Sequence, residues 1–353
     1  MNIIVQKFGG TSVSTEDRRK QVAIKVKEAI ENGFTPIVVV SAMGRKGQPY
    51  ATDTLLTLID DKFKETNRNS KDLLMCCGEI ISSVVVANAL YNEGIEAVPL
   101  TGGQAGIITD DNFCEAEYIS IDIDRLLSVV REGKVPVVTG FQGITKDGYF
   151  TTLGRGGSDT TACILGNAVK AKEIEIYTDV DGIMTADPRI VEDASLIDEI
   201  TYNEVFQLAD QGAKVIHPKA VDLAKKGNIP LFIKNTLSES KGTLISNDIM
   251  CNERRYITGI TYLNNRIQVR IRLSENSNIK AYQSLLSILA KNHISLDLIN
   301  IFPAHQFFTV DKSEKENVSS ILDLVGIKYS IIEECSTIAI VGAGMTGVPG
   351  IMA

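Results

Sequence analysis

The sequence has little histidine, no paired cysteine motif and no long apolar run, and each absence excludes a class of protein. Its three histidines, His217, His293 and His305, show neither ligand spacing nor a serine or cysteine arrangement. A histidine-dependent hydrolase and a metal site built from histidine and cysteine are therefore disfavoured. The six cysteines form no CxxC pair and no disulfide framework, so we expect small buried hydrophobic residues in a cytosolic protein.

Charge and hydropathy exclude two further kinds of partner. The longest apolar runs, such as Ile37–Val40 and Val84–Ala87, are shorter than the roughly 20 residues that cross a bilayer. The N-terminus lacks the cationic and apolar regions of a signal peptide. The 36 basic and 44 acidic residues give a net charge of −8, which argues against a general nucleic-acid binder. We expect no membrane and no nucleic-acid partner, whereas a small anionic ligand could still be held by a few local cations.

The first 235 of the 353 residues alternate short β-branched runs with longer helical patterns. Strands are predicted over Ile3–Phe8, Ile37–Val40, Ala97–Leu100, Val135–Thr139, Glu173–Tyr177 and Leu231–Lys234. Amphipathic helices are predicted over Glu16–Asn32, Leu73–Glu93 and Thr160–Lys170. This order predicts βαβ units and hence an α/β fold, with a mostly parallel sheet covered by helices on both faces. An Asp-Gly turn at 146–148 predicts a hairpin.

Small or polar clusters follow every one of these predicted strands. They are Gly9-Gly10-Thr11, Ser41-Ala42, Thr101-Gly102-Gly103, Gly140-Phe141-Gln142, Thr178-Asp179 and Asn235-Thr236. In open α/β sheets ligands bind outside the carboxyl ends of the strands. Ordinary turns use the same residue types, but several clusters also carry charge that a turn does not require. We therefore expect the ligand site at this edge of the sheet.

The pattern changes after Gly242. Polar, linker-like segments are followed by strands predicted over 266–273, 294–301, 306–311 and 327–334 and helices over 278–291 and 313–325. This βαββαβ order is that of a ferredoxin-like unit. A further strand, Thr337–Val341, leads into a glycine-rich end. We accordingly predict domains over 1–245 and 246–335, with 336–353 opening a second ferredoxin-like unit.

A lysine and two glycines stand where the first predicted strand ends and a helix begins. Gly9 and Gly10 allow close approach of the backbone to a ligand, and the N–H groups of the following helix favour an anion. Lys7 supplies a point charge suited to phosphate, although a lysine at a strand end is more often simply solvated. The segment is not a Walker A loop. Ser14, followed three residues later by Asp17, is predicted to cap the helix.

The strongest local signal is the segment 151–161, in which three glycines surround an arginine before Ser, Asp and two Thr open an apolar helix. Ser158 or Asp159 could simply cap that helix. Capping does not explain Arg155 among glycines, where its guanidinium could bind a carboxylate through two hydrogen bonds. The pattern favours a binding function.

Two further acidic positions each have two interpretations. Asp179 follows a predicted strand and could meet a nucleotide or its metal, whereas the nearby Asp181-Gly182 and Asp187-Pro188 are plausible turns. Glu79 is predicted near the start of an apolar helix, where it could favour the helix dipole or receive a substrate ammonium group. Both interpretations stay open at this point.

Five motifs together resemble the aspartate kinase family, in the right order and over essentially the whole chain. They are KFGGTSV (Lys7–Val13), VSAMG (Val40–Gly44), TTLGRGGSDTTA (Thr151–Ala162), YTDVDGIMTADPR (Tyr177–Arg189) and GAKVIHPKAV (Gly212–Val221). Within the family, Ser41–Asp53, LINIFP (Leu298–Pro303) and VGAGMTGVPG (Val341–Gly350) are most similar to the diaminopimelate-sensitive aspartokinase I type. The resemblance implies an amino-acid-kinase domain over 1–245, an ACT-like regulatory domain over 246–335 and the start of a second, incomplete ACT unit over 336–353.

The resemblance also implies roles for individual residues. The ATP phosphates would be held by Lys7, Phe8, Gly9 and Gly10, with Ser41 nearby. Aspartate would be held by Thr52, Glu79, Arg155, Gly156, Gly157 and Ser158. The nucleotide site would be completed by Thr178, Asp179, Thr185, Ala186, Asp187, Pro188, Arg189 and Lys214. Catalysis would rest on Lys7, Arg155 and Asp159, the last organising the reacting groups.

The implied reaction is Mg²⁺-dependent transfer of the γ-phosphoryl group of ATP to the β-carboxylate of L-aspartate. That carboxylate, with an ordinary pKa of about 3.9, is already ionised at neutral pH and needs no general base. Cations and oriented N–H groups must instead offset the repulsion between two anions. The implied partners are ATP, aspartate, an amino-acid effector (meso-diaminopimelate favoured over lysine or threonine) and a second copy of the chain, paired through ACT domains.

Two alternatives compete with this interpretation. A nicotinamide dehydrogenase is suggested by Gly342-x-Gly344-x-x-Gly347 after a strand, but no helix, second strand or acidic residue about 20 positions on follows this glycine motif. A non-catalytic amino-acid sensor is the other, and the intact Lys7, Arg155 and Asp159 argue against it.

Overall fold

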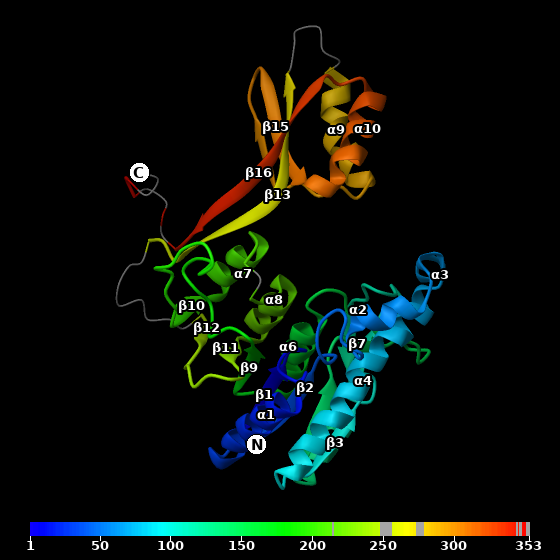
Figure 1. The fold of residues 1–353 in the computed structure, drawn as a ribbon, viewed down its shortest axis with the longest axis vertical. Coiled ribbons are helices and arrows are strands. Elements are labelled where there is room, and N and C mark those ends of the chain that lie inside the picture. Colours follow the sequence, from blue (N-terminus) through cyan, green and yellow to red (C-terminus); the bar gives the residue numbers. More distant parts are fainter. Residues whose placement is uncertain (214, 248–255, 273–278, 344, 346–347, 351–353) are drawn as a thin grey trace. The chain divides into compact units, whose positions relative to one another are not determined.

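A large sheet in the computed structural model has the strand order β10-β12-β11-β9-β1-β2-β6-β3 (Figure 1). Its strands are β1 (Ile3–Phe8), β2 (Thr35–Val40), β3 (Ala97–Leu100), β6 (Val135–Thr139), β9 (Glu173–Thr178), β10 (Glu199–Thr201), β11 (Leu231–Asn235) and β12 (Thr243–Ser246). Neighbours pair in parallel, apart from β11 with β12. The predicted mostly parallel sheet is confirmed, and the six strands predicted within the first 235 residues are present within two residues of their expected ends.

The structure describes residues 1–213, 215–247, 256–272, 279–343, 345 and 348–350. The chain divides into two compact units, one formed by Met1–Gly259 with Val341–Ala353 and the other by Ile260–Ile340. We describe each unit by itself, beginning with the larger.

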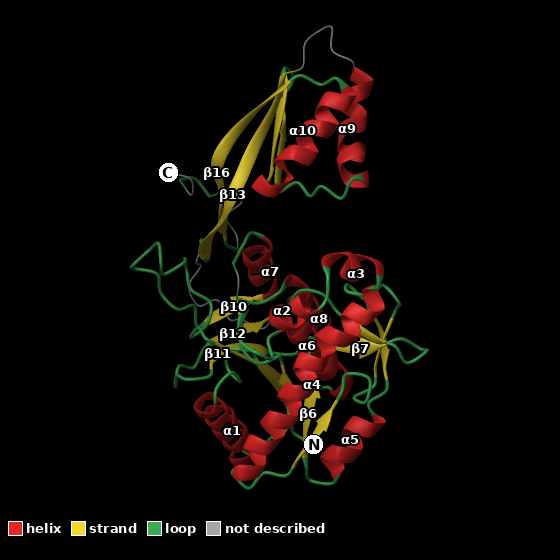
Figure 2. Ribbon diagram, turned by 45° about the vertical axis from the view of Figure 1, so that its right-hand side comes forward, coloured by secondary structure: helices red, strands yellow, loops and turns green. Residues whose placement is uncertain are grey.

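Helices cover both faces of the large sheet (Figure 2). One face carries α1 (Glu16–Glu31) and α4 (Arg68–Asn92), whose side chains join a core cluster with Phe8, Val38 and Val137. The opposite face is covered by α5 (Asp124–Arg131), α6 (Gly157–Val169), α7 (Tyr202–Asp210) and α8 (Pro218–Gly227). The two clusters take alternate residues of β1 and β2 because successive side chains of a strand point to opposite faces.

Helix α4 is, within the described residues, the one helix long and apolar enough to cross a membrane by length and composition. Half of its apolar stretch is buried in the protein, and Val86, Ala87 and Leu90 belong to the core cluster. Its buried face also carries Asp72 and Glu79. These contacts are those of a helix that packs on a sheet.

The segment between β2 and α4 contains the short helices α2 (Thr52–Leu55), η1 (Leu56–Leu58) and α3 (Asp61–Thr66). A smaller sheet of order β5-β4-β7-β8 consists of β5 (Tyr118–Ile121), β4 (Ile107–Thr109), β7 (Gln142–Ile144) and β8 (Phe150–Thr152). The predicted hairpin at 146–148 is confirmed, because β7 and β8 pair in antiparallel fashion on either side of it. Strand β8 leads directly into the glycine-flanked Arg155.

One helix start differs from the prediction. The N-cap of α1 is Thr15, whose hydroxyl accepts a hydrogen bond from the Arg18 backbone N–H. Ser14 was expected in this role, but its hydroxyl donates to the Thr11 carbonyl oxygen at 2.9 Å instead. The cap therefore lies one residue further along, because Ser14 is engaged in the preceding turn.

The second unit has the predicted βαββαβ order. It comprises β13 (Gly259–Arg272), α9 (Ile279–Lys291), β14 (Leu298–Ile301), β15 (His305–Asp311), η2 (Lys312–Glu314), α10 (Lys315–Val325) and β16 (Tyr329–Val341). The sheet of this unit has the strand order β14-β15-β13-β16 and packs against a core that includes Val269, Leu285 and Phe308. This sheet with its helices fits an ACT-like fold.

The two strands predicted over 327–334 and 337–341 are one strand in the structure, β16. Glu334 adopts a φ of 57° within it, so a single left-handed residue accommodates the irregularity that the sequence pattern suggested was a break. The remaining residues keep the extended conformation. The assignment of 336–353 to a second ferredoxin-like unit stays a prediction.

Candidate active site

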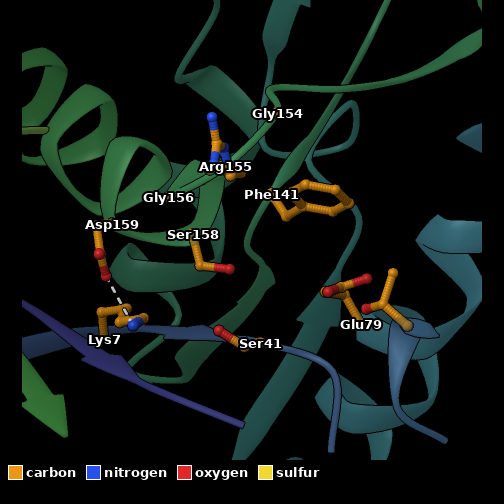
Figure 3. Close-up of a pocket in the computed structure, with 11 residues that line it drawn as sticks. Lys7, Ser41, Glu79, Phe141, Gly154, Arg155, Gly156, Ser158 and Asp159 are labelled. Atoms are coloured by element: carbon orange, nitrogen blue, oxygen red, sulfur yellow. Dashed lines mark ion pairs between the residues drawn. The ribbon is translucent and has the colours of Figure 1, made fainter. Parts of the chain in front are cut away.

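A cavity of about 310 Å³ lies where β1, β2 and β6 end (Figure 3). Lys7 comes from β1, Ser41 follows β2 and Phe141 follows β6. The cavity is lined by Lys7, Ser41, Thr52, Glu79, Phe141, Gly154, Arg155, Gly156, Gly157, Ser158 and Asp159. Parallel pairing brings these carboxyl ends to one edge, where the strand-end clusters predicted a ligand site.

The cavity brings together the residues that the resemblance implies for aspartate binding and those that it implies for catalysis. Its lining includes every residue named for aspartate binding, the three named for catalysis, and Ser41 from the nucleotide set. Phe141 and Gly154 also line it but were not singled out from the sequence. Gly154 belongs to the same glycine-rich segment as Arg155, and this proximity was the signal that could have identified it.

The start of α6 tests the interpretation that Ser158 or Asp159 caps this helix. The cap position is Gly156, and the helix begins at Gly157, so neither Ser158 nor Asp159 occupies the capping position. Gly156 has a φ of 70°, and a Cβ on it would lie 2.2 Å from the Cβ of His217. Glycine is thus required here, and the side chains of Ser158 and Asp159 face the cavity.

Lys7 and Asp159 form an ion pair inside the cavity. The Lys7 Nζ lies 2.7 Å from Asp159 Oδ1, and the two side chains are only 12% and 14% exposed. Figure 3 shows the pair bridging the end of β1 and the first turn of α6. In such a partly desolvated place a Coulombic interaction is stronger than in water, so Asp159 holds the ammonium group at a defined position.

Glu79 is a buried carboxyl group with one oxygen unused. Its Oε1 accepts a hydrogen bond from the Ala42 backbone N–H at 3.1 Å, whereas Oε2 has no hydrogen-bond partner in the part of the chain that the structure describes. Burial raises the pKa of Glu79 to about 8, although the Ala42 N–H opposes this shift. Because α4 begins at Arg68, Glu79 lies well inside the helix, and its interpretation as a first-turn dipole partner is wrong.

Phe141 occupies a backbone conformation that is rare for a residue with a side chain, with a φ of 71°. Its N–H donates to Thr161 Oγ1 at 3.0 Å, and its carbonyl oxygen accepts from the Leu153 N–H at 2.9 Å. These bonds attach the end of β6 to the Arg155 loop and to α6. The strain at this position is of the kind that surrounding structure sustains at binding sites. From the sequence it was visible only as part of a strand-end cluster.

The glycine turn predicted to meet the ATP phosphates follows β1 and is bonded to the ends of β9 and β11. The Gly9 N–H donates to the Tyr177 carbonyl oxygen at 3.2 Å, which ties the glycine turn to the end of β9. The Phe8 side chain is buried and its ring stacks on Tyr177 with centroids 4.7 Å apart, so the predicted contact of Phe8 with a ligand would have to use its backbone. A buried hydroxyl pair, Ser12 and Thr236 with oxygens 2.6 Å apart, links the same turn to the residue after β11.

The other described residues of the predicted nucleotide set lie outside the cavity lining, and they contact protein groups both within and beyond their own loops. Asp179 forms an ion pair with Arg45 at 2.6 Å, and Val180 N–H donates to Thr178 Oγ1 at 3.1 Å. Arg189 donates twice to the carboxylate of Asp187, at 3.0 and 2.7 Å. The contact of Asp179 with a nucleotide or its metal stays a prediction. The predicted residue Lys214 lies outside the described residues.

The pKa of Glu79 generates a prediction about stability. Unfolded chains lose a glutamate proton near pH 4.5, whereas the folded protein keeps this one to about pH 8. The folded state therefore binds more protons within that window, and the stability that the neutral carboxyl contributes is lost as the pH rises through it. The free energy of unfolding of Glu79→Gln, minus that of the parent protein, should rise by up to about 1.4 kcal/mol for each pH unit between about pH 4.5 and pH 8. Above that range the difference should stay constant.

Urea denaturation between about pH 5 and 9 measures this difference. Glu65→Gln, at an exposed position on α3, is the control and should show no comparable trend. A difference between Glu79→Gln and the parent that does not vary with pH would contradict the assigned burial effect.

Comparison with known proteins places this geometry in a family. The model of the amino acid kinase family matches residues 2–235. Aspartokinase 1 of Bacillus subtilis (strain 168) is 43% identical over 99% of this chain and 88% of its own length. Aspartokinase of Geobacillus stearothermophilus is 36% identical over 100% of this chain and 87% of its own length.

Solved structures agree with these relatives. Escherichia coli aspartokinase III in complex with lysine and aspartate has a TM-score of 0.78 and 27% identity, covering 97% of this chain and 87% of that one. The same enzyme with aspartate and ADP has a TM-score of 0.77 and 26% identity, covering 99% and 90%. The chain therefore belongs to the amino acid kinase family, as an aspartokinase that phosphorylates aspartate at the expense of ATP.

Proposed function

We propose that the cavity binds aspartate between Arg155 and Glu79, with its β-carboxylate directed toward Lys7. The observation that carries this proposal is the convergence of one exposed guanidinium, one buried carboxyl with an unused oxygen and one paired lysine in a single cavity. Arg155 suits the α-carboxylate because its planar fork donates two parallel hydrogen bonds. Glu79 suits the ammonium group, which supplies the donor that Oε2 lacks.

Phosphoryl transfer in this site is a matter of positioning and electrostatics. The attacking β-carboxylate is already an anion, so the reaction needs no proton acceptor. Lys7 would offset the negative charge that accumulates between the carboxylate and the γ-phosphoryl group, and Asp159 would hold Lys7 in place. The glycine turn at Gly9 and Gly10 would bring backbone N–H groups to the phosphates. ADP and 4-phospho-L-aspartate are the products.

The residues also fit Mg²⁺ that arrives with ATP. Mg²⁺ is bound in proteins through one or two carboxylates together with substrate phosphates and water, not through a complete protein cage. No cluster of three or more His, Cys, Asp or Glu that could hold a metal occurs in the described ranges, and Asp159 supplies a carboxylate beside Lys7. When bound, Mg²⁺ would neutralise charge on the phosphates.

We further propose that residues 246–335 form an ACT-like regulatory domain and that the enzyme works as a homo-oligomer paired through such domains. Feedback control by an amino acid follows from this arrangement, since an effector changes activity when its affinity differs between active and inactive states. The sequence type favours meso-diaminopimelate as the effector.

The test of the proposed reaction is ADP release with aspartate, glutamate or acetate as the acceptor. Aspartate should support release, acetate should not, and glutamate, longer by one methylene, should be much poorer. An amino-acid sensor would release no ADP with any of them, and a nicotinamide dehydrogenase would oxidise or reduce its cofactor instead.

Arg155→Lys tests the assignment of the aspartate carboxylate. The variant keeps the charge but loses the planar fork, so the KM for aspartate should rise by about tenfold or more while the KM for ATP changes little. Arg131→Lys, an exposed position on α5, is the matched control and should change neither constant. Equal and small changes of both constants in Arg155→Lys would refute the assignment.

Lys7→Ala tests whether this lysine acts in the transition state. Loss of one preorganised electrostatic group should lower kcat by about 10²-fold or more in steady-state kinetics. A variant with near-normal kcat and only a raised KM for ATP would assign Lys7 to nucleotide binding alone.

The effector is tested by titrating the initial rate with meso-diaminopimelate, lysine and threonine separately. We expect inhibition by meso-diaminopimelate at concentrations where lysine and threonine have little effect. Strong inhibition by lysine without any by meso-diaminopimelate would overturn the assigned subtype and leave the catalytic assignment untouched.

A further inference from the structure

Helix α4 carries two buried carboxyl groups on one face. Asp72 is fully buried and Glu79 is 3% exposed. They lie seven residues apart, about two helical turns, so both point to the same side of α4. Glu79 lines the cavity, whereas Asp72 does not and has no place in the mechanism described above.

The Asp72 carboxylate accepts hydrogen bonds from the segments that lead to the cavity. Its Oδ2 accepts from the backbone N–H groups of Cys114 and Thr152, at 2.9 and 3.0 Å. Its Oδ1 accepts from Thr152 Oγ1 at 2.7 Å. Hydrogen bonds to a charged group contribute more to stability than neutral ones, so α4 holds Thr152 by its backbone and its side chain together.

Thr152 is the last residue of β8 and lies three residues before Arg155. Between Thr152 and α6 the chain has left-handed glycines on both sides of Arg155, Gly154 with a φ of 73° and Gly156 with a φ of 70°. Glycine restricts the backbone least of all residues, so the place of Arg155 depends on the anchors at the two ends of this loop. Asp72 forms the anchor at the β8 end, and α6 itself forms the other.

Other hydrogen bonds join α4 to the smaller sheet and join the strands of that sheet to one another. Gln142 Nε2 donates to the Cys76 carbonyl oxygen at 3.2 Å, which joins α4 to β7. The Thr151 and Thr109 hydroxyl oxygens lie 2.6 Å apart in the interior, which joins β8 to β4. One helix therefore presents Glu79 to the cavity directly and holds the Arg155 loop through Asp72.

We propose that Asp72 is a positioning residue that fixes the distance between Arg155 and Glu79 and so adjusts the cavity to its amino-acid substrate. The inference rests on the proposed roles of Arg155 and Glu79 in binding aspartate. Two groups that must meet the carboxylate and the ammonium of one small molecule tolerate little displacement, since a shift of about 1 Å can lower a rate by 10²-fold. Asp72 touches neither substrate and acts through Thr152.

The alternative is that Asp72 merely stabilises the fold, and substrate-specific kinetics separate the two roles. Asp72→Ala removes all three acceptor contacts and should raise the KM for aspartate about tenfold while the KM for ATP stays within about twofold. Asp72→Asn should restore a near-parental KM, because its amide oxygen can accept from both backbone N–H groups while its NH₂ donates to Thr152 Oγ1. All variants are assayed well below their unfolding temperatures.

Glu204→Ala is the matched control for the loss of a buried carboxylate. Glu204 is 9% exposed and accepts hydrogen bonds from the Thr201 N–H, the Thr201 hydroxyl and the Thr258 hydroxyl, outside the cavity lining. This variant should lower stability without a selective change in the KM for aspartate. The same selective rise in Glu204→Ala, or parallel changes of both KM values in Asp72→Ala, would overturn the proposal.

Thr152→Val keeps the test decisive if Asp72→Ala does not fold. It removes only the hydroxyl donor and should raise the KM for aspartate about threefold, with Thr152→Ser restoring it. An unchanged KM in Thr152→Val would then count against the proposal. Arg155→Lys in the same assay separates the positioning role of Asp72 from the proposed aspartate site. If Arg155→Lys raises the KM for aspartate while Asp72→Ala does not, the positioning role is refuted and the proposed binding site stands.

Discussion

The parallel pairing of β1 with β2 on one side and β9 on the other is the constraint on which the site depends. Lys7 pairs in register with Val39 and with Ile176, so the ends of all three strands fall at the same edge. β6 continues this alignment, because Val40 pairs with Thr139. A shift of one residue in any pairing would turn a strand's side chains to the opposite face and remove its contribution to the cavity.

Burial in this site is used in two opposite ways. Lys7 and Asp159 form an ion pair at a place of little exposure, where each charge offsets the other. Among the described residues Glu79 has no such charged partner, and burial raises its pKa to about 8. A substrate ammonium would supply the missing charge, which couples occupancy of the cavity to the ionisation of Glu79. In the proposed binding mode, the cavity suits a ligand that carries both charges of an amino acid.

Placement of the groups proposed to bind the substrate comes from supporting contacts more than from the groups themselves. Arg155 stands between two left-handed glycines and cannot fix its own position. Thr152, held by Asp72, anchors the β8 end of the Arg155 loop. The backbone hydrogen bonds of Phe141 to Leu153 and Thr161 attach this loop and α6 to the end of β6. If the proposed roles hold, the interior of the larger unit contributes to specificity through side chains that never meet the substrate.

Local pattern by itself determined the α/β fold, the six strands of the parallel sheet and the βαββαβ unit, and it singled out the glycine-flanked Arg155, because periodicity and turn chemistry are local properties. Only the tertiary structure decided that Ser158 and Asp159 are not caps, that Glu79 lies inside α4 with an unused oxygen, and that Phe141 borders the cavity. The role of Asp72 was likewise invisible, since its donors are 42 and 80 residues away. Burial and hydrogen bonding between distant segments exist only once the chain has folded, and no local pattern encodes them.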